Sequence, residues 1–163
     1  MIARIIRLIC IWLSTKLPSI TIPTSDKKPY LTRYYCFWAD RIFGNIYLHH
    51  FHSSDTDIAP SGEFYFHSHP WPWSVSIILV GGYKEIRLVW NNDLKKYGFY
   101  EKIYRFGNLN FLNDKIFHRV ELLENDAWSL FFTGWRSKNR NWGFMDPVTA
   151  KYVDFTNISK AIK

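Results

Sequence analysis

The feature that most constrains the fold is a series of short apolar or alternating runs that begins at residue 30 and continues almost to the end of the chain. Turn-forming residues, as at 81–82 and 107–108, separate these runs. Short runs at regular spacing are typical of β-sandwiches and barrels, and aromatic residues, 19% of the chain, fit a half-buried pleated surface. We therefore predict an all-β sandwich or barrel. The expected strands are 30–37, 45–52, 63–67, 74–80, 83–90, 100–106, 109–112, 118–122 and 127–133, with 142–145 and 152–155 as edge strands.

Residues 1–29 have a different pattern, and we predict that they form an amphipathic helix and a linker, with the β domain covering 30–163. A membrane-spanning helix needs about 20 apolar residues, and the longest uncharged stretch runs only from 8 to 15. Three interpretations stay open: the helix packs on the domain, lies on a membrane surface, or is a weak secretory signal. The apolar stripe is Ile2, Ile5, Ile6, Ile9 and Leu13, and the nearby cations Arg4, Arg7 and Lys16 lie mostly outside it.

Length and composition limit the class of protein. The 163 residues suffice for one domain with a buried core, and 47% apolar residues exclude disorder as the main state. The formal charge of +7 favours anionic partners in general, but the cations are spread over loops and indicate no specific nucleic-acid surface. Cys10 and Cys36 are too few for a disulfide framework or a zinc site. We therefore expect a reducing, cytoplasmic location.

The histidines carry the clearest chemical signal. His67 and His69 are separated by one residue, and on a strand this spacing places both imidazoles on one face. Two imidazoles on one face are half of a transition-metal site. Pro70 and Pro72 follow at once, so the pair is expected at a strand end, beside a rim or cavity.

The residues around this pair resemble the first sequence motif of the cupins, in which two histidines are followed by a Glu and then a Gly. Gly81 stands where that Gly is expected, whereas Ser74 replaces the Glu. The second cupin motif resembles the stretch from Gly107 to His118, although other positions of the motif differ. The resemblance implies a cupin-type double-stranded β-helix, a jelly-roll barrel, here preceded by a short N-terminal helix.

Within the cupins, the chain resembles the cysteine dioxygenases, which also lack the motif Glu and bind ferrous iron through three histidines. The similarity includes the Lys-Glu pair at 84–85 and the His-Arg-Val-Glu run at 118–121. Phe131 and Thr133 stand where those enzymes place a further histidine, behind the metal ligands, and a catalytic tyrosine. The resemblance therefore carries over the metal ligands but not the thiol-oxidising residues. The ligands that it implies are His67, His69 and His118.

The chain is also similar to a group of small bacterial and phage-type cupins, over roughly residues 30–155. This resemblance implies a fold more than a reaction. The matching segments are 30–33, 48–55, 67–71, 81–85, 118–122 and 140–144.

Alternation along the predicted strands gives expectations for other polar residues. Glu85 shares a face with Tyr83 and Arg87, which makes it a candidate fourth metal ligand or base, or a surface residue. His50 and His52 share the parity of apolar neighbours, so we expect them to face the interior and His49 to face outward.

Arg119 follows His118 directly, so alternation points its side chain away from a metal, toward an acid such as Glu121. Trp71, Arg136 and Arg140 are candidate substrate-binding residues, since guanidinium groups beside aromatic rings can hold phosphate or carboxylate.

We therefore expect a metal-binding cupin with a three-histidine site for a divalent transition metal. Fe(II) is the first choice, with Zn, Ni or Mn as alternatives. A non-haem iron dioxygenase acting on a small anionic substrate is the favoured function. A non-catalytic ligand-binding or regulatory cupin is the alternative, and a sugar isomerase is weaker. A homodimer and weak membrane-surface contact of the N-terminal helix stay open as further partners.

Overall fold

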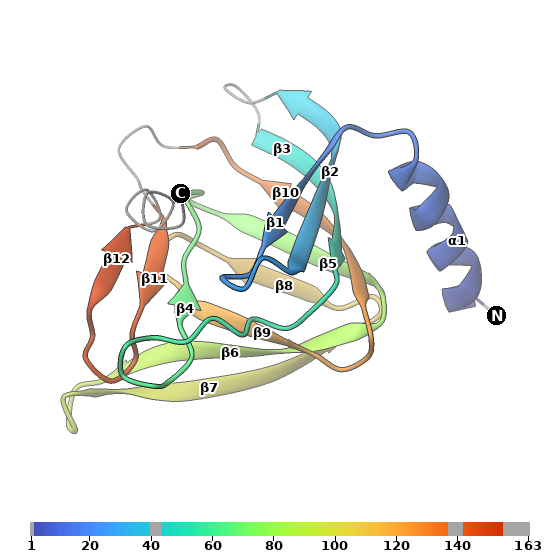
Figure 1. Ribbon diagram of the computed structural model, residues 1–163. Helices are drawn as coiled ribbons and strands as arrows, with labels where there is room; N and C mark the ends of the chain where they lie inside the picture. The colour runs from blue at the N-terminus through green and yellow to red at the C-terminus, as the bar shows by residue number, and fades with distance from the viewer. Residues whose placement is uncertain (1, 40–43, 137–141, 155–163) are drawn as a thin grey trace.

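The computed structural model describes residues 2–39, 44–136 and 142–154, and this part of the chain forms one helix and twelve strands (Figure 1). The helix is α1 (Ile2–Ser14). The strands are β1 (Ser19–Pro23), β2 (Pro29–Ala39), β3 (Gly44–Phe51), β4 (Phe66–His67), β5 (Ser74–Val80), β6 (Gly82–Asn91), β7 (Lys96–Arg105), β8 (Leu109–Leu112), β9 (His118–Leu122), β10 (Ala127–Thr133), β11 (Gly143–Met145) and β12 (Tyr152–Asp154).

The strands form two six-stranded antiparallel sheets that face each other (Figure 1). One sheet has the order β1-β2-β3-β10-β5-β8 and the other has the order β12-β11-β4-β9-β6-β7. Neighbouring strands within each sheet are mostly distant in sequence, so the chain crosses repeatedly from one sheet to the other. The all-β prediction is confirmed, and four strands, β5, β8, β9 and β10, have the predicted bounds.

Two segments differ from the predicted pattern. The strand expected at 63–67 is reduced to β4, because the preceding residues close a loop in which Ala59 N–H donates to Glu63 C=O at 2.7 Å. Within the expected linker, 17–29, the β-branched run of β1 pairs with β2, from Ser19 opposite Tyr34 onward. This segment therefore adds an edge strand to the first sheet.

Helix α1 lies against the outer face of the first sheet (Figure 1). The contact confirms that the helix packs on the domain, but it uses only part of the predicted stripe. Ile2, Ile5 and Ile9 remain exposed. The side chains in the contact are Ile6, Cys10 and Leu13 from the helix and Leu48, Val80 and Trp128 from the sheet.

Strand β3 is covered on both faces, since every residue from Gly44 to Phe51 is buried or half-buried. Leu48 packs with Cys10 of α1, so its face lies under the helix. His50 shares this face and stacks on Trp128 with ring centroids 3.9 Å apart. The opposite face of β3 borders the space between the two sheets.

The predicted orientation of the β3 histidines is wrong. His49 is 3% exposed and lines the internal cavity, whereas His50 and His52 lie on the helix side. His52 bonds Thr32 through its Nε2 at 2.8 Å. Ile46 and Leu48 lie on the same face of β3 as His50. This face is apolar because α1 covers it, not because it borders the cavity.

The glycine expected from the first cupin motif has a steric role at the β5–β6 turn. Gly81 has φ of +67°, and a Cβ at this position would lie 2.4 Å from the carbonyl oxygen of Asp126. A residue with a side chain would therefore meet both backbone strain and a clash. Gly107, the match in the second motif, also has a positive φ, of +79°.

Asp126 ties α1 to the sheet, and its removal should destabilise the protein. Its carboxylate accepts from Arg7 Nη1 at 2.6 Å, from His50 Nε2 at 3.0 Å and from Trp128 Nε1 at 3.1 Å. Because Arg7 is partly solvent-exposed, we expect Asp126→Ala to lower the free energy of unfolding by about 1–2 kcal/mol in urea denaturation. Asp93→Ala, at an exposed turn, is the control, and equal effects of the two variants would contradict the anchoring role.

The same variant has an expected pH dependence. Burial opposes ionisation of Asp126, but hydrogen bonds from Arg7 and His50 outweigh it and lower the pKa of this carboxyl. Its contribution to stability is therefore present above the unfolded pKa of about 3.9 and is lost as the pH falls through the lower folded pKa. The stability difference between wild type and Asp126→Ala should shrink below about pH 4.

Candidate metal centre

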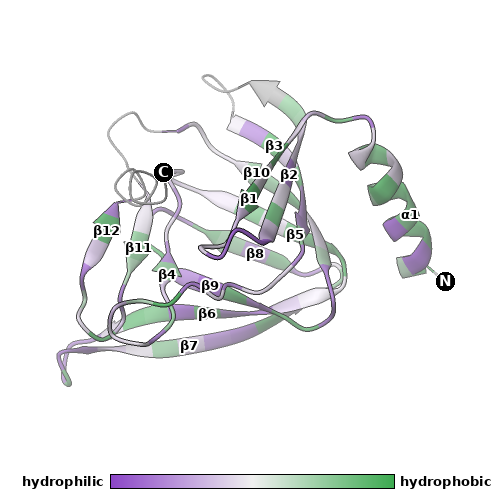
Figure 2. Ribbon diagram, in the orientation of Figure 1, coloured by the Kyte–Doolittle hydropathy of each residue, from purple (hydrophilic) through white to green (hydrophobic). Residues whose placement is uncertain are grey.

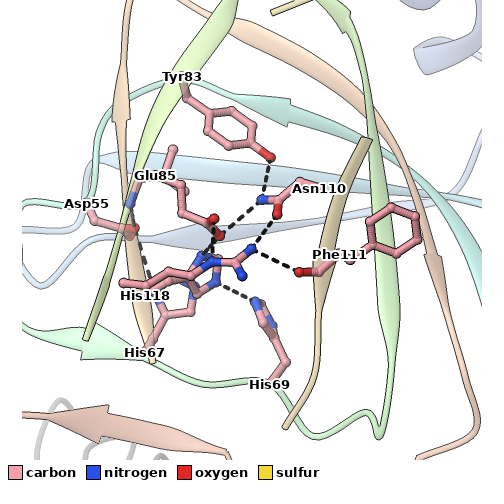
Figure 3. Close-up of polar contacts among 10 residues, drawn as sticks. Asp55, His67, His69, Tyr83, Glu85, Asn110, Phe111 and His118 are labelled. Atoms are coloured by element: carbon pink, nitrogen blue, oxygen red, sulfur yellow. Dashed lines mark hydrogen bonds and ion pairs between the residues drawn. The ribbon is translucent and has the colours of Figure 1, made fainter. Parts of the chain in front are cut away.

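Three histidines converge between the sheets, as Figure 3 shows. One ring nitrogen from each of His67, His69 and His118 lies within 4.8 Å of the others. His69 Nε2 and His118 Nε2 are 2.8 Å apart. Among the described residues this is the one group of three or more histidine, cysteine or acidic side chains with that spacing. The histidines predicted as metal ligands are thus brought together.

Strand pairing positions the group. His67 in β4 is the register partner of His118 in β9, and β4 is held on its other side by β11, where Phe144 faces His67. His69 follows β4 immediately, and Ser68 between the two histidines bonds Gly143 through its backbone N–H at 3.0 Å. The two-residue spacing of 67 and 69 therefore keeps both rings on one side.

Glu85 lies behind His118 and outside the three-histidine group. Its Oε1 is 2.6 Å from Nδ1 of His118, and the Nε2 of that ring faces His69. Glu85 is 1% exposed, and Asn110 Nδ2 donates to the same Oε1 at 3.0 Å. The structure thus gives Glu85 the position of a residue that orients a ligand, in place of the fourth-ligand position that the sequence allowed.

The carboxylate of Glu85 belongs to a network that joins the two sheets. Arg87 donates from Nε to Glu85 Oε2 at 2.7 Å and from Nη2 to Asn110 Oδ1 at 2.7 Å. Asn110 also donates to the hydroxyl of Tyr83 at 3.2 Å. Burial raises the pKa of Glu85, but the contacts with His118, Asn110 and Arg87 outweigh it and hold this pKa at about 2. The buried carboxylate is therefore ionised at neutral pH.

Asp55 stands behind His67 in a similar way. Its Oδ2 is 3.6 Å from His67 Nδ1 and accepts from the backbone N–H of Val120 at 2.7 Å. Burial raises the pKa of Asp55 to about 6, although the Val120 N–H opposes the shift. Two carboxyl groups thus lie on the side of the histidines that faces away from their meeting point.

The electrostatic surroundings suit metal binding. Burial lowers the pKa of His67 and of His69 well below the usual value, and the neighbouring His118 adds to both shifts. These imidazoles are therefore neutral, as a metal ion requires of its ligands. Metal–nitrogen bonds are about 2.0–2.1 Å long, so His69 Nε2 and His118 Nε2, 2.8 Å apart, are close enough that one ion would contact both.

The three imidazoles border a cavity of about 480 Å³, a size suited to a small molecule. Its walls are mainly aromatic and aliphatic. Trp71 is 5% exposed and stacks beside His69, with ring centroids 5.8 Å apart. Phe131 also lines the cavity and stacks on His49, with centroids 4.7 Å apart. The cavity thus offers a largely apolar space beside the nitrogen group.

Arg33 brings a positive charge into this wall. Its Nε donates to His49 Nε2 at 3.2 Å, and its guanidinium lies over the rings of Tyr47 and Trp71, at 4.8 and 5.4 Å. Burial and then Arg33 lower the pKa of His49 well below its usual value, so His49 accepts this bond as a neutral ring. Within the described residues, Arg33 has no carboxylate at ion-pair distance.

The other residues singled out from the sequence have different positions. Trp71 and Arg136 both line the cavity, and Arg136 is exposed, whereas Arg140 lies outside the described residues. Arg119 bonds Glu121 through Nη2 at 2.5 Å, which confirms the predicted pairing. Thr133, in contrast, is buried in β10, where its hydroxyl accepts from the N–H of Asn45 at 3.2 Å.

Sequence reasoning missed the roles of Arg33, His49 and Asp55. Alternation on β2 and β3 contains a signal, since Arg33 shares its face with Leu31, and His49 shares its face with Phe51. Which of the two faces borders the cavity follows only from the position of α1. Asp55 lies after β3, and no periodicity indicates where its side chain points.

Comparison of the sequence with known protein families and with curated proteins gives no match. Comparison of the fold with solved structures does. HEPD from Streptomyces albus, with 2-hydroxyethylphosphonate and Fe(II) bound, matches with a TM-score of 0.54 and 10% identity, over 76% of this chain and 25% of HEPD. Fe(II)-HppE with the alternative substrate (S)-1-HPP matches with a TM-score of 0.52 and 10% identity, over 73% of this chain and 56% of HppE.

The chain thus spans a quarter of HEPD and little more than half of HppE. At such low identity the similarity concerns the fold. The two facing antiparallel sheets and the helix before them agree with the architecture expected from the motifs at His67 and His118. This chain has the double-stranded β-helix fold of the cupins.

Proposed function

We propose that His67, His69 and His118 bind a divalent transition metal, with Fe(II) as the first choice, and that the cavity beside them takes a small anionic substrate for oxidation by O₂. The observation that carries the proposal is the convergence of three imidazoles, at least two of them neutral, at one cavity. HEPD and HppE, which share the fold, contain Fe(II), and this supports iron.

The residues behind the histidines would hold the ligands in place. Glu85 fixes the ring of His118 through Nδ1 and leaves Nε2 directed at His69. An ionised carboxylate in this position also makes the imidazole a better electron donor. When bound, the metal supplies Lewis acidity, and Fe(II) also supplies the redox chemistry needed with O₂.

Arg33 would select the charge of the substrate. The guanidinium of Arg33 is half-buried and has no carboxylate partner among the described residues, so an anion that enters the cavity supplies the opposite charge that it lacks. A carboxylate or phosphonate oxygen can accept from the same guanidinium that lies over Trp71. The phosphonate bound by HEPD supports this class of substrate.

To test the function, the Fe(II)-loaded protein is mixed with small carboxylates, phosphonates or neutral sugars. Thermal shift measures binding, and O₂ consumption measures oxidation. Anions are expected to raise the melting temperature, and at least one is expected to be oxidised. Arg33→Gln should weaken anion binding about 10- to 100-fold, because a hydrogen bond to a charged group is lost. Lys96→Gln is the control, because Lys96 is exposed and does not line this cavity.

The outcomes separate the candidate functions. Anion binding that depends on Arg33, without O₂ consumption, would favour the non-catalytic binding protein. A preference for neutral sugars, or equal anion binding by Arg33→Gln and wild type, would contradict the proposed substrate class.

A further inference from the structure

Helix α1 has a second apolar face that the fold leaves uncovered. Ile6, Cys10 and Leu13 face the sheet. Successive residues of a helix are 100° apart, so Ile2, Ile5, Leu8, Ile9 and Trp12 form a separate stripe. These five side chains are 51–64% exposed: Ile2 is 64%, Ile5 51%, Leu8 60%, Ile9 51% and Trp12 61% exposed.

The helix is positively charged and lies on the outside of the two sheets. Its sequence contains Arg4 and Arg7 and no acidic residue, and Lys16 follows its end. Figure 1 shows α1 outside the two sheets, and Figure 2 shows its hydrophilic residues in the turns nearest the N-terminus. An exposed apolar stripe with a tryptophan and basic flanks is typical of helices that lie at a membrane surface.

A basic hollow adjoins the N-terminal half of the helix. It has a volume of about 430 Å³ and is bordered by Arg4, Arg7, Arg105 and the exposed ring of Phe106, with Glu124 as its acidic residue. Arg7 is paired with Asp126. In the described part of the chain, Arg4 and Arg105 have no carboxylate at ion-pair distance. The hollow therefore offers two unpaired guanidinium groups beside an apolar surface.

We propose that this surface docks the protein on an anionic lipid bilayer. The stripe of Ile2, Ile5, Leu8, Ile9 and Trp12 would enter the headgroup–acyl boundary, and Arg4 and Arg105 would contact lipid phosphates. The described part of the chain contains no helix with the length and hydropathy of a membrane span. An amphipathic helix of this kind lies in the plane of the interface.

Charge favours a bilayer over a second copy of the chain. Two copies paired through α1 would bring cations together without any acidic residue of the helix to neutralise them. An anionic membrane surface complements the same cations. The proposal does not depend on the metal centre, because the helix covers the outer face of the sheet and the histidines lie on the inner side.

The test is sedimentation of the full chain with vesicles of phosphatidylcholine alone or with about 30% phosphatidylglycerol. Binding is expected to be far stronger with the anionic lipid and to fall as salt is raised. Arg4→Gln and Arg105→Gln should each weaken it about fivefold. The triple variant Ile5→Ser, Leu8→Ser, Trp12→Ser should weaken it at least ~50-fold, since three apolar side chains no longer leave water.

A matched control replaces three exposed apolar residues elsewhere, Val89→Ser, Leu94→Ser and Ile103→Ser on β6, β7 and their turn. It should bind the vesicles as the wild type does, and circular dichroism should show that both triple variants are folded. Failure to bind either vesicle, or equal binding by the two triple variants, would overturn the proposal. Sedimentation velocity provides a further test. A wild-type dimer that dissociates in the α1 triple variant but not in the control variant would also overturn the proposal, because the stripe would then be a dimer interface.

Discussion

His69→Ala is expected to lower the affinity for Fe(II) or Zn(II) at least ~100-fold. Loss of a residue that hydrogen-bonds to a metal ligand costs about 10- to 100-fold in affinity, and loss of the ligand itself should cost more. The same loss is expected for His67→Ala and His118→Ala. The fold should survive, since the sheets are held by strand pairing and by apolar clusters on both sides of the first sheet. Competition with a chromophoric chelator measures the affinity, and circular dichroism measures the fold.

His52→Ala is the matched control for these variants. His52 is on the helix side of the first sheet, where it bonds Thr32, and it does not belong to the three-histidine group. It should bind metal as the wild type does. Unchanged affinity in all three site variants would remove the basis for the metal centre. His69→Ala is the most informative of them, because His118 also holds the buried carboxylate of Glu85.

Glu85→Gln is expected to destabilise the protein by about 3–5 kcal/mol, the usual cost of breaking a buried charge pair. The change keeps the shape of the side chain but leaves Arg87 without its carboxylate partner. Because Glu85 also fixes the ring of His118, metal affinity should fall about 10- to 100-fold. Urea denaturation and chelator competition measure the two effects.

The pH dependence of this variant follows from the low pKa of Glu85. The folded pKa of about 2 lies below the ordinary value, so the carboxylate stabilises the fold above the unfolded pKa, and this contribution is lost as the pH falls toward 2. Glu101→Gln is the control. Glu101 lies on β7, is exposed to solvent and pairs with Lys84 of β6. A stability loss no larger than that of Glu101→Gln would show that the network around Glu85 does not support the site.

Two of the three histidines, His67 and His69, could be predicted because their signal is local. Side chains two residues apart in an extended backbone share a face. His69 lies just after β4, and its ring centroid is 5.1 Å from that of His67. His118 was harder to place, because its position opposite His67 depends on the pairing of β4 with β9. The motif resemblance supplied that long-range contact.

The features that could not be predicted depend on more distant packing. The orientation of His49 and His50 depends on which face of β3 the helix covers. Period-two alternation shows that two faces differ but not which of them borders the cavity. The role of Glu85 likewise depends on Asn110 from the opposite sheet, and Arg33 is identified only once the cavity exists.

Elemental analysis of the full chain, purified without a histidine tag, tests the central claim most directly. A metal centre formed by His67, His69 and His118 predicts close to one equivalent of a divalent transition metal per chain, with iron foremost, and almost none in His69→Ala prepared in parallel. Wild-type protein that contains no transition metal, and that takes up none from an Fe(II) solution under anaerobic conditions, would contradict the claim.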